Sequence, residues 1–457
     1  MTKTEHRALA YASVIALGGF LFGFDAVVIS GVMPFITPEF GLNEWWVGAI
    51  VSAPSLAAIL AALTVGPIAD YVGRKRVMIT LALLYTISAV ASALAPDATT
   101  LFVARLIGGL AFGTLMLAPI YIAEIAPARL RGRMVSVNQF NIVIGFSAAY
   151  FANYYILQLS QSGSDLAVNL GIDQFAWRWM LGLEALPAAL YFFFMMLVPE
   201  SPRWLVLEGH TERARDIMQR IAPAEQIEEL LSCIRDSAQE ATHNLLAKIK
   251  DMFRPELRMV LIVGLIAGIA QQSSGINAVY FYAPTIFEQS GVGTDAAFAQ
   301  ATYIGLVNIV FTIAAMLLID KLGRRPLMLA GLTGIAASMF LAAWGFHAES
   351  PTIVLAGILG FVASFAFSLG PVMWVLFSEI FPNRIRGVCM AFMGIVNSGV
   401  SWFIQFIFPV ELAHFGPVIT FSIFAITAVV FLVLLTWLMP ETRGRSLEEL
   451  EKELARA

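Results

Sequence analysis

Twelve apolar stretches of about 20 residues each constrain this chain more than any other feature, because a helix of that length spans a bilayer. In lipid a helix satisfies its own backbone hydrogen bonds, so such stretches favour membrane spans. Only 13% of the 457 residues are charged, against about 25% in a typical soluble domain, which excludes a soluble fold. The predicted spans are 9–33, 46–69, 77–95, 100–122, 135–158, 177–198, 259–287, 299–319, 327–346, 352–377, 388–410 and 416–439.

Lysine and arginine residues indicate which side of the membrane each connection faces. The two termini and every second connection carry 26 of the 28 basic side chains. The other two are Arg105, inside a span, and Arg178, at the start of the sixth span. Basic connections stay in the cytoplasm, so both termini are predicted to be cytoplasmic. We expect a multi-pass, monomeric protein surrounded by lipid, in the inner membrane if the cell is bacterial.

Three motifs occur twice, separated by 250, 255 and 241 residues. Asp70-Tyr-Val-Gly-Arg-Lys returns as Asp320-Lys-Leu-Gly-Arg-Arg, and Glu124-Ile-Ala-Pro-Ala-Arg-Leu-Arg-Gly returns as Glu379-Ile-Phe-Pro-Asn-Arg-Ile-Arg-Gly. Pro199-Glu-Ser-Pro-Arg closes the first six spans, as Pro440-Glu-Thr-Arg-Gly closes the second six. The repeat predicts two six-helix halves of the same topology, an architecture that places a substrate site at the midplane.

The predicted organisation has four parts. Residues 1–199 form an N-terminal six-helix bundle, 200–257 an intracellular linker, 258–440 a C-terminal six-helix bundle and 441–457 a cytoplasmic tail. Charged residues alternate with Leu, Ile and Ala at helical spacing in the linker, which predicts short amphipathic helices. The fold class is therefore an all-α membrane protein with cytoplasmic helices between its two halves.

The repeated motifs lie at cytoplasmic helix ends, where carboxylates and guanidinium groups can pair across helices. Pairs that break when the halves separate would act as latches for one conformation. The alternative is that Gly73 and Gly323 only permit tight turns while the arginines follow the charge rule; the two interpretations are compatible. The candidate latch residues are Asp70, Arg74, Glu124, Arg131, Glu200, Arg203, Asp320, Arg324, Glu379 and Arg386.

Several other functions find no support in the sequence. The basic residues are scattered, so no nucleic-acid partner is expected, and no GxxxxGK[ST] motif is present to bind ATP. The five histidines lie in loops or termini and lack the spacing of metal ligands or a catalytic dyad, so we expect no metal, no organic cofactor and no enzyme activity. Cys233 and Cys389 are interpreted as ordinary thiols.

Three charged residues lie inside spans, where a charge is costly and marks function by default. They are Asp25 in the first span, Arg105 in the fourth and Glu184 in the sixth. The pKa of a carboxyl group falls beside an arginine and rises on burial away from it, so a conformational change could load and unload a proton. A static ion pair that fastens helices is the alternative.

The combined motifs resemble the sugar porter family of the major facilitator superfamily, and within it the bacterial proton-coupled xylose and glucose symporters. The resemblance runs from Gly18-Gly-Phe-Leu-Phe-Gly-Phe-Asp25 to Pro440-Glu-Thr-Arg-Gly. It includes Pro199-Glu-Ser-Pro-Arg-Trp-Leu205, Gln271-Gln-Ser-Ser-Gly-Ile-Asn277, and Gly370-Pro-Val-Met-Trp374 followed by Ser378-Glu-Ile-Phe-Pro382. In proton-coupled members an acid and an arginine corresponding to Asp25 and Arg105 pair, whereas uncoupled facilitators usually have asparagine in place of Asp25. The resemblance leaves Glu184 as either a structural anchor or a second proton group.

A sugar hydroxyl both donates and accepts hydrogen bonds, so amides suit its recognition, and an aromatic face suits the C–H surface of the ring. The family resemblance assigns such a role to several polar and aromatic side chains within the spans. Interhelical hydrogen bonding is the alternative role for any single membrane amide. The candidate sugar-binding residues are Phe22, Gln139, Gln271, Gln272, Asn277, Asn308, Trp374 and Asn397.

Departures from the family pattern bear on the substrate. Asn397-Ser398 stands where the family has an amide followed by tryptophan. One aromatic ring of the site is therefore missing unless Trp402, one turn further on, replaces it. Phe281-Tyr282 replaces consecutive tyrosines, and Phe146 replaces a glutamine of the xylose transporter. We therefore expect a proton-coupled symporter of a monosaccharide, a hexose in preference to a pentose. The alternatives are an uncoupled sugar uniporter, a symporter of a polyol or organic acid, and a transporter-like sugar sensor.

Overall fold

The computed structural model contains helices and no strands in the residues that it describes, which are 3–127, 129–222, 227–240, 245–382 and 385–441. The first half contains α1 (Lys3–Glu39), α2 (Glu44–Val72), α3 (Arg74–Ala93), α4 (Ala98–Ala111), α5 (Thr114–Ile125), α6 (Arg131–Gln161), α7 (Asp165–Asn169), α8 (Ala176–Gly182) and α9 (Ala185–Leu197). The linker contains α10 (Pro202–Leu207), α11 (Thr211–Ile221), α12 (Ile227–Glu240), α13 (Leu245–Met252) and the short 3₁₀ helix η2 (Pro255–Leu257). The second half contains α14 (Arg258–Ser273), α15 (Ile276–Gln289), α16 (Thr294–Leu322), α17 (Arg324–His347), α18 (Pro351–Phe367), α19 (Leu369–Ile380) and α20 (Arg386–Leu438).

Local signals in the sequence set several helix starts. The Asp97 side chain accepts a hydrogen bond from the Thr100 amide at 2.8 Å and caps α4. Ser201 caps α10 in the same way, and Pro202 occupies its first turn, where proline loses no helical hydrogen bond. Among the described residues, eleven helical segments are long and apolar enough to cross a membrane.

The last of these segments, α20, covers two predicted spans. It runs for 53 residues but Gly416 within it has φ 74° and ψ 168°, a conformation open mainly to glycine. The backbone therefore breaks where the sequence predicts the connection between 388–410 and 416–439. Counted this way, the structure contains the twelve predicted spans in order.

Four spans are interrupted along their length. The fourth breaks between α4 and α5, the sixth between α8 and α9, the seventh between α14 and α15, and the tenth between α18 and α19. Glu184 lies at the break in the sixth span, and Gly275, with φ 87°, lies at the break in the seventh. Interrupted spans free backbone groups and commonly line binding sites in transporters.

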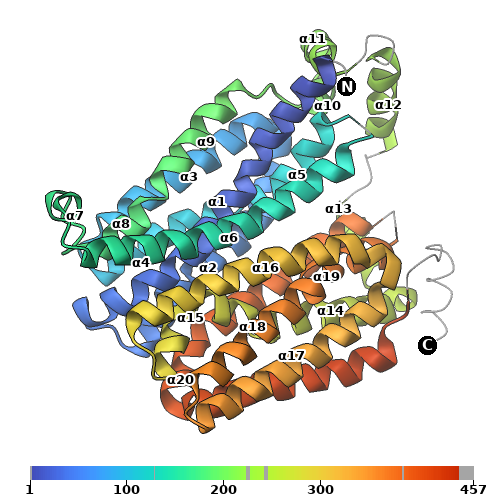
Figure 1. Cartoon of the computed structure of the whole chain (residues 1–457). Coiled ribbons are helices and arrows are strands. Elements are labelled where there is room, and N and C mark those ends of the chain that lie inside the picture. Colours follow the sequence, from blue (N-terminus) through green and yellow to red (C-terminus); the bar gives the residue numbers. More distant parts are fainter. Residues whose placement is uncertain (1–2, 128, 223–226, 241–244, 383–384, 442–457) are drawn as a thin grey trace. The chain divides into compact units, whose positions relative to one another are not determined.

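The chain divides into two compact units that do not follow the two halves of the sequence. The first comprises 1–26, 57–149 and 178–244, and the second comprises 27–56, 150–177 and 245–457. Thus α1, α2 and α6 each have one end in each unit. Within the first unit α3 lies alongside α9, and within the second α17 lies alongside α18 (Figure 1). The predicted domain boundaries stay a prediction.

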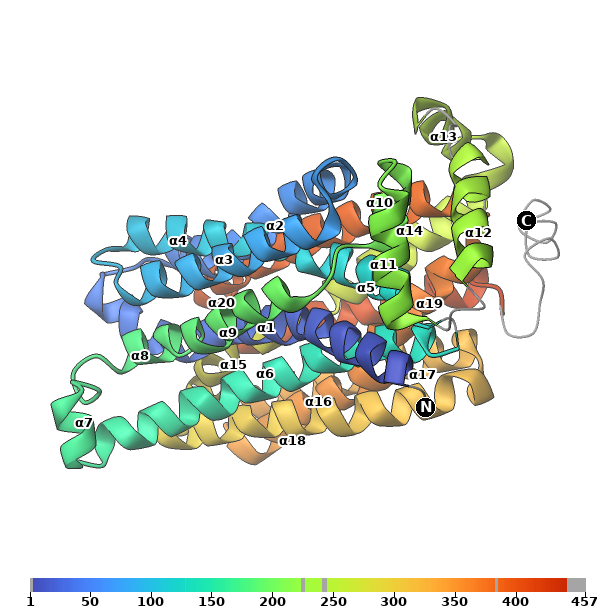
Figure 2. The same cartoon turned by 90° about the horizontal axis from the view of Figure 1, so that it is seen from above.

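The linker carries the short helices that its sequence predicts. In the first unit α10, α11 and α12 lie next to one another (Figure 2). Their apolar faces form a small core of Leu205, Val206, Ala214, Met218, Ile227 and Leu231.

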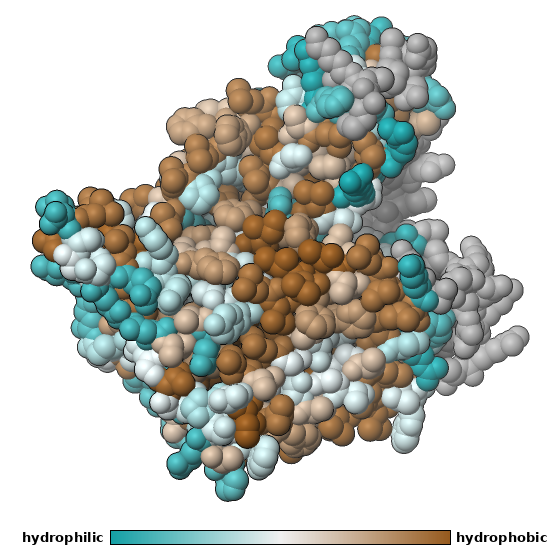
Figure 3. Space-filling model, in the orientation of Figure 1, coloured by the Kyte–Doolittle hydropathy of each residue, from teal (hydrophilic) through white to brown (hydrophobic). Residues whose placement is uncertain are grey.

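The surface of the spans is apolar where lipid would contact it. Figure 3 shows apolar side chains gathered over α16, with polar side chains concentrated near helix ends. On α16, Val310 is 61% exposed and Leu317 is 68% exposed. Such exposure would be costly in water and is expected in hydrocarbon.

Candidate functional site

A buried charged cluster occupies the middle of the first unit. The Arg105 guanidinium on α4 forms an ion pair with the Asp25 carboxylate on α1 and also donates to the Asp25 backbone carbonyl at 3.1 Å. The side chains of Asp25, Arg105 and Glu184 are at most 3% exposed. The three intramembrane charged residues of the sequence are therefore brought together.

The Glu184 carboxyl lies against that of Asp25. Oδ2 of Asp25 and Oε1 of Glu184 are both buried without a hydrogen-bond donor among the described residues. The cluster therefore contains two buried carboxyl groups and one guanidinium group.

Helices α3 and α4 pack closely around the Asp25 carboxyl. A Cβ atom at Gly108 would lie 3.1 Å from Oδ2 of Asp25 and 2.5 Å from Oγ of Ser88. The Ser88 hydroxyl donates to the Ala104 carbonyl at 2.8 Å, which ties α3 to α4 beside the ion pair. Glycine at 108 therefore lets α4 approach the Asp25 carboxyl.

Four of the candidate amides form one hydrogen-bonded cluster in the second unit. Asn397 on α20 donates to Oε1 of Gln271 at 2.9 Å and to the Gly268 carbonyl at 3.1 Å. Gln272 donates to Oδ1 of Asn397 at 3.0 Å, and Asn277 donates to Oε1 of Gln272 at 2.8 Å. Amides from both sides of the break in the seventh span thus meet the eleventh span.

The cluster continues along α20 through residues that the sequence prediction missed. Asn277 donates to Oγ of Ser401 at 2.7 Å, and Gln405 donates to the same oxygen at 2.7 Å. Oε1 of Gln405 accepts from the Ser55 hydroxyl of α2 at 2.9 Å. Ser401 and Gln405 follow Asn397 by four and eight residues, and this spacing on one helix face could have identified them.

The other predicted sugar-binding residues of the second unit are less connected. Asn308 on α16 accepts from Thr312 of the same helix at 3.4 Å. Trp374 on α19 is 37% exposed and meets Phe377 edge to face at 5.8 Å between ring centroids. Trp402 stacks on Phe406, with centroids 5.8 Å apart and an interplanar angle of 18°.

Phe22 and Gln139 belong to the first unit. Phe22 meets Phe112 edge to face with ring centroids 4.6 Å apart, and its centroid lies 6.4 Å from that of Phe146. Gln139 on α6 is exposed. An exposed amide within a span fits a position that faces a polar cavity better than one that faces lipid.

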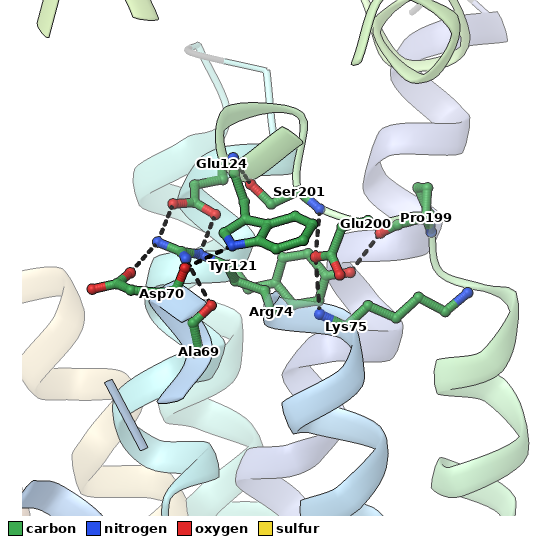
Figure 4. Close-up of polar contacts among 10 residues, drawn as sticks. Ala69, Asp70, Arg74, Lys75, Tyr121, Glu124, Pro199, Glu200 and Ser201 are labelled. Carbon is green, nitrogen blue, oxygen red and sulfur yellow. Dashed lines mark hydrogen bonds and ion pairs between the residues drawn. The ribbon is translucent and has the colours of Figure 1, made fainter. Parts of the chain in front are cut away.

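The repeated motif of the first half forms a compact set of polar contacts (Figure 4). Arg74 at the start of α3 donates to both carboxylate oxygens of Glu124, at 3.2 and 3.4 Å, and pairs with Asp70 at 2.8 Å. Glu200 accepts from the backbone amides of Lys75 at 3.0 Å and Ser201 at 2.8 Å.

The second half repeats these contacts at matching positions. Arg324 pairs with Glu379 at 2.8 Å, as Arg74 pairs with Glu124. Glu441 accepts from the backbone amides of Arg324 and Arg325, each at 3.2 Å, as Glu200 does from that of Lys75. The candidate set omitted Glu441, although its place in the Pro440-Glu repeat could have identified it.

A glycine with positive φ precedes each arginine. Gly73 has φ 102° and Gly323 has φ 90°. A Cβ atom at Gly73 would collide with the Glu200 carboxylate, and one at Gly323 would lie 2.8 Å from that of Glu441. The turn and the carboxylate contact therefore both require glycine.

The described pairs join helices within one half, and their breaking during transport stays a prediction. Arg131 and Arg203 are exposed, and Arg386 donates to the Phe381 carbonyl at 3.3 Å. The Asp320 side chain and tail residues 442–457 lie outside the described part of the chain.

Comparisons with known proteins bear on the family and the fold. A family model described as sugar (and other) transporter matches residues 11–454. The arabinose-proton symporter of Bacillus subtilis is 37% identical, over 98% of this chain and 96% of that protein. The glucose transporter of Staphylococcus epidermidis is 35% identical, over 96% and 95%. A solved inward open structure of the xylose transporter from E. coli has a TM-score of 0.83 at 32% identity, covering 98% of this chain and 99% of that chain.

These matches run almost end to end, and they confirm the fold class and the family resemblance inferred from the motifs. The chain belongs to the sugar porter family of the major facilitator superfamily, a family of transporters.

Proposed function

We propose that this protein is a proton-coupled monosaccharide symporter that works by alternating access. The observation that carries the proposal is the buried cluster of Asp25, Arg105 and Glu184 with more carboxyl groups than cations. Its relatives include an arabinose-proton symporter, which supports proton coupling. The proton is the coupling ion, and no organic cofactor or metal is needed.

The proton step uses the Asp25–Arg105 pair. In the ion-paired state the Arg105 guanidinium faces the Asp25 carboxylate, with the Glu184 carboxyl beside them. Protonation of Asp25 from the outer side removes the attraction that joins α1 to α4, so the two helices can move apart. Return to the ion-paired state releases the proton on the other side.

The sugar step uses the amide cluster of Gln271, Gln272, Asn277 and Asn397. Each amide offers a donor and an acceptor, which matches the hydroxyl groups of a sugar. We propose that sugar hydroxyls replace the amide-to-amide bonds, with Trp374 against the ring. We further propose a hexose, because Ser398 and Phe281 lack the ring and the hydroxyl that the family pattern has there.

Placement in the membrane follows from charge. The connections rich in Lys and Arg are proposed to be cytoplasmic, with both termini inside and the protein in a cell membrane, the inner membrane if the cell is bacterial. The connection between α1 and α2 then lies outside.

The decisive experiment measures external pH in proteoliposomes at zero membrane potential after addition of glucose, galactose or xylose. We expect alkalinisation with at least one sugar in the parent, and none with Asp25→Asn, although sugar counterflow persists. Glu411→Gln is the matched control, because Glu411 is a half-buried acid of α20 just after the predicted span 388–410 and should leave coupling intact.

Any other result of this experiment favours one of the alternative functions. Sugar uptake without a pH change would leave an uncoupled uniporter. No response to any sugar would turn attention to a polyol or organic acid, tested in the same vesicles.

A further inference from the structure

A chain of hydrogen bonds leads from the amide cluster to α2. Asn277 donates to Ser401, Gln405 donates to the same Ser401 oxygen, and Oε1 of Gln405 accepts from Ser55. Gln405 is 1% exposed and Ser401 is 8% exposed, so water does not compete for these bonds. All four residues belong to the second unit.

The same face of α2 packs closely against α20. Trp45 lies 5.8 Å from Phe406 between ring centroids. A Cβ atom at Gly48 would collide with the Phe406 carbonyl oxygen. Trp45, Gly48 and Ser55 are spaced by three and seven residues, which places them on one side of the helix. We call this set of contacts, with Gln405, the α2–α20 contact.

We propose that Gln405 is a positioning residue that makes the strength of the α2–α20 contact depend on occupancy of the amide cluster. The proposal rests on the proposed sugar site and names a residue outside it. No candidate set drawn from the sequence contained Gln405 or Ser55.

The physical basis is competition for one oxygen. Oγ of Ser401 accepts from Asn277 and from Gln405, each at 2.7 Å. A sugar hydroxyl that engages the Asn277 amide removes one of these donors, so the bond from Gln405 strengthens. The Gln405 side chain is then held more firmly toward Ser55. Sugar binding therefore favours the closed α2–α20 contact, which is the coupling that occlusion of a bound substrate requires.

Tyr282 of the seventh span also contacts Gln405. The Tyr282 hydroxyl donates to the Gln405 backbone carbonyl at 3.0 Å, and Tyr282 follows Asn277 by five residues on α15. Two residues of α15 are thus linked to Gln405. Tyr282 bonds to the Gln405 backbone, and Asn277 is linked to the Gln405 side chain through Ser401. Displacement of α15 on sugar binding would reach Gln405 by both routes.

The test uses full-length protein in which Cys233→Ser and Cys389→Ala remove the native thiols and Ser52→Cys supplies a probe. Ser52 is 1% exposed and follows Gly48 by four residues on α2, so a membrane-impermeant maleimide should reach it only when the contact opens. We expect Ser55→Ala and Gln405→Leu each to raise the labelling rate about fivefold, the effect of one lost hydrogen bond. The double variant should be no faster than either single one, and Ser55→Thr should restore the parent rate.

A second arm adds the sugar that the parent binds. Saturating sugar should slow labelling of the parent and leave the rate unchanged in Gln405→Leu, while radiolabelled sugar still binds to that variant. An equal slowing in both, or additive effects of Ser55→Ala and Gln405→Leu, would overturn the proposal. If no sugar binds to the parent, the proposed function fails, and the sugar-free arm still tests the Ser55–Gln405 link.

Discussion

The buried charged cluster lies in spans of the N-terminal half, and the hydrogen-bonded amide cluster lies in spans of the C-terminal half. At the helix ends, by contrast, the two halves make the same contacts. Arg74 pairs with Glu124 as Arg324 pairs with Glu379. Glu200 and Glu441 accept from backbone amides at matching positions. The repeat therefore retains the contacts that assemble each bundle and differs where a ligand would bind. This difference is why we propose the proton site in one half and the sugar site in the other.

Loss of the arginine from the charged cluster should have the largest effect. Arg105→Ala leaves buried carboxyl groups without their cation, which costs about 3–5 kcal/mol. We expect a large drop in thermal stability in detergent, partly restored by adding Asp25→Asn. Arg76→Ala, which removes an exposed arginine of the same half, is the control. Equal stability of Arg105→Ala and Arg76→Ala would contradict the buried ion pair.

The matching helix ends predict matching effects in the two halves. Gly73→Ala and Gly323→Ala each force a side chain into positive φ beside a carboxylate, at a cost of about 1–3 kcal/mol. Gly132→Ala is the control, since no atom lies within 4 Å of a Cβ there. Urea or thermal unfolding measures all three. A tolerated alanine at only one of the two turns would show that the halves differ there as well.

The amide cluster should be more sensitive than an amide outside it. Asn397→Ala removes bonds to Gln271 and Gln272, so we expect the half-saturating sugar concentration in counterflow to rise about tenfold, or 1.4 kcal/mol. Asn308→Ala removes one acceptor for Thr312 on its own helix and should change that value less. The reverse order would place the sugar nearer α16.

The smallest expected effect concerns the two tryptophans. Trp402 already stacks on Phe406, so Trp402→Phe should change sugar affinity less than about threefold, which is under 1 kcal/mol. Trp374→Phe, which alters the proposed ring platform, should change it more. Equilibrium binding of the sugar to each variant measures the two effects. A larger loss of affinity in Trp402→Phe would show that Trp402 replaces the tryptophan that the family has at position 398.

The spans, the repeat and the glycine turns were predictable because each depends on local chemistry. Length and apolarity fix a span, and a glycine before a basic residue at positions 73 and 323 marks a turn. The charged cluster was also predictable, since so few charges lie in the membrane that Asp25, Arg105 and Glu184 had few other partners.

Hydrogen-bond partners that depend on how the helices pack could not be predicted from the sequence. Ser401 and Gln405 join the amide cluster because α20 faces the break in the seventh span, and a serine and a glutamine in a span carry no such signal alone. Asn308 looked equivalent to Asn397 in the sequence, yet Asn308 bonds to Thr312 of its own helix, whereas Asn397 bonds to Gln271 of another span. The division of α1, α2 and α6 between two units likewise depends on which helix ends pack together.

The amides of Gln271, Gln272, Asn277 and Asn397 bond to one another and to backbone carbonyls. A solute that enters such a site exchanges hydrogen bonds instead of adding them, so each contact contributes little net free energy. Modest affinity means a short residence time, because differences in affinity between related complexes appear mostly in the dissociation rate. The proposed sugar site is thus suited to rapid release of its sugar, and its amides would re-form their own hydrogen bonds as the sugar leaves.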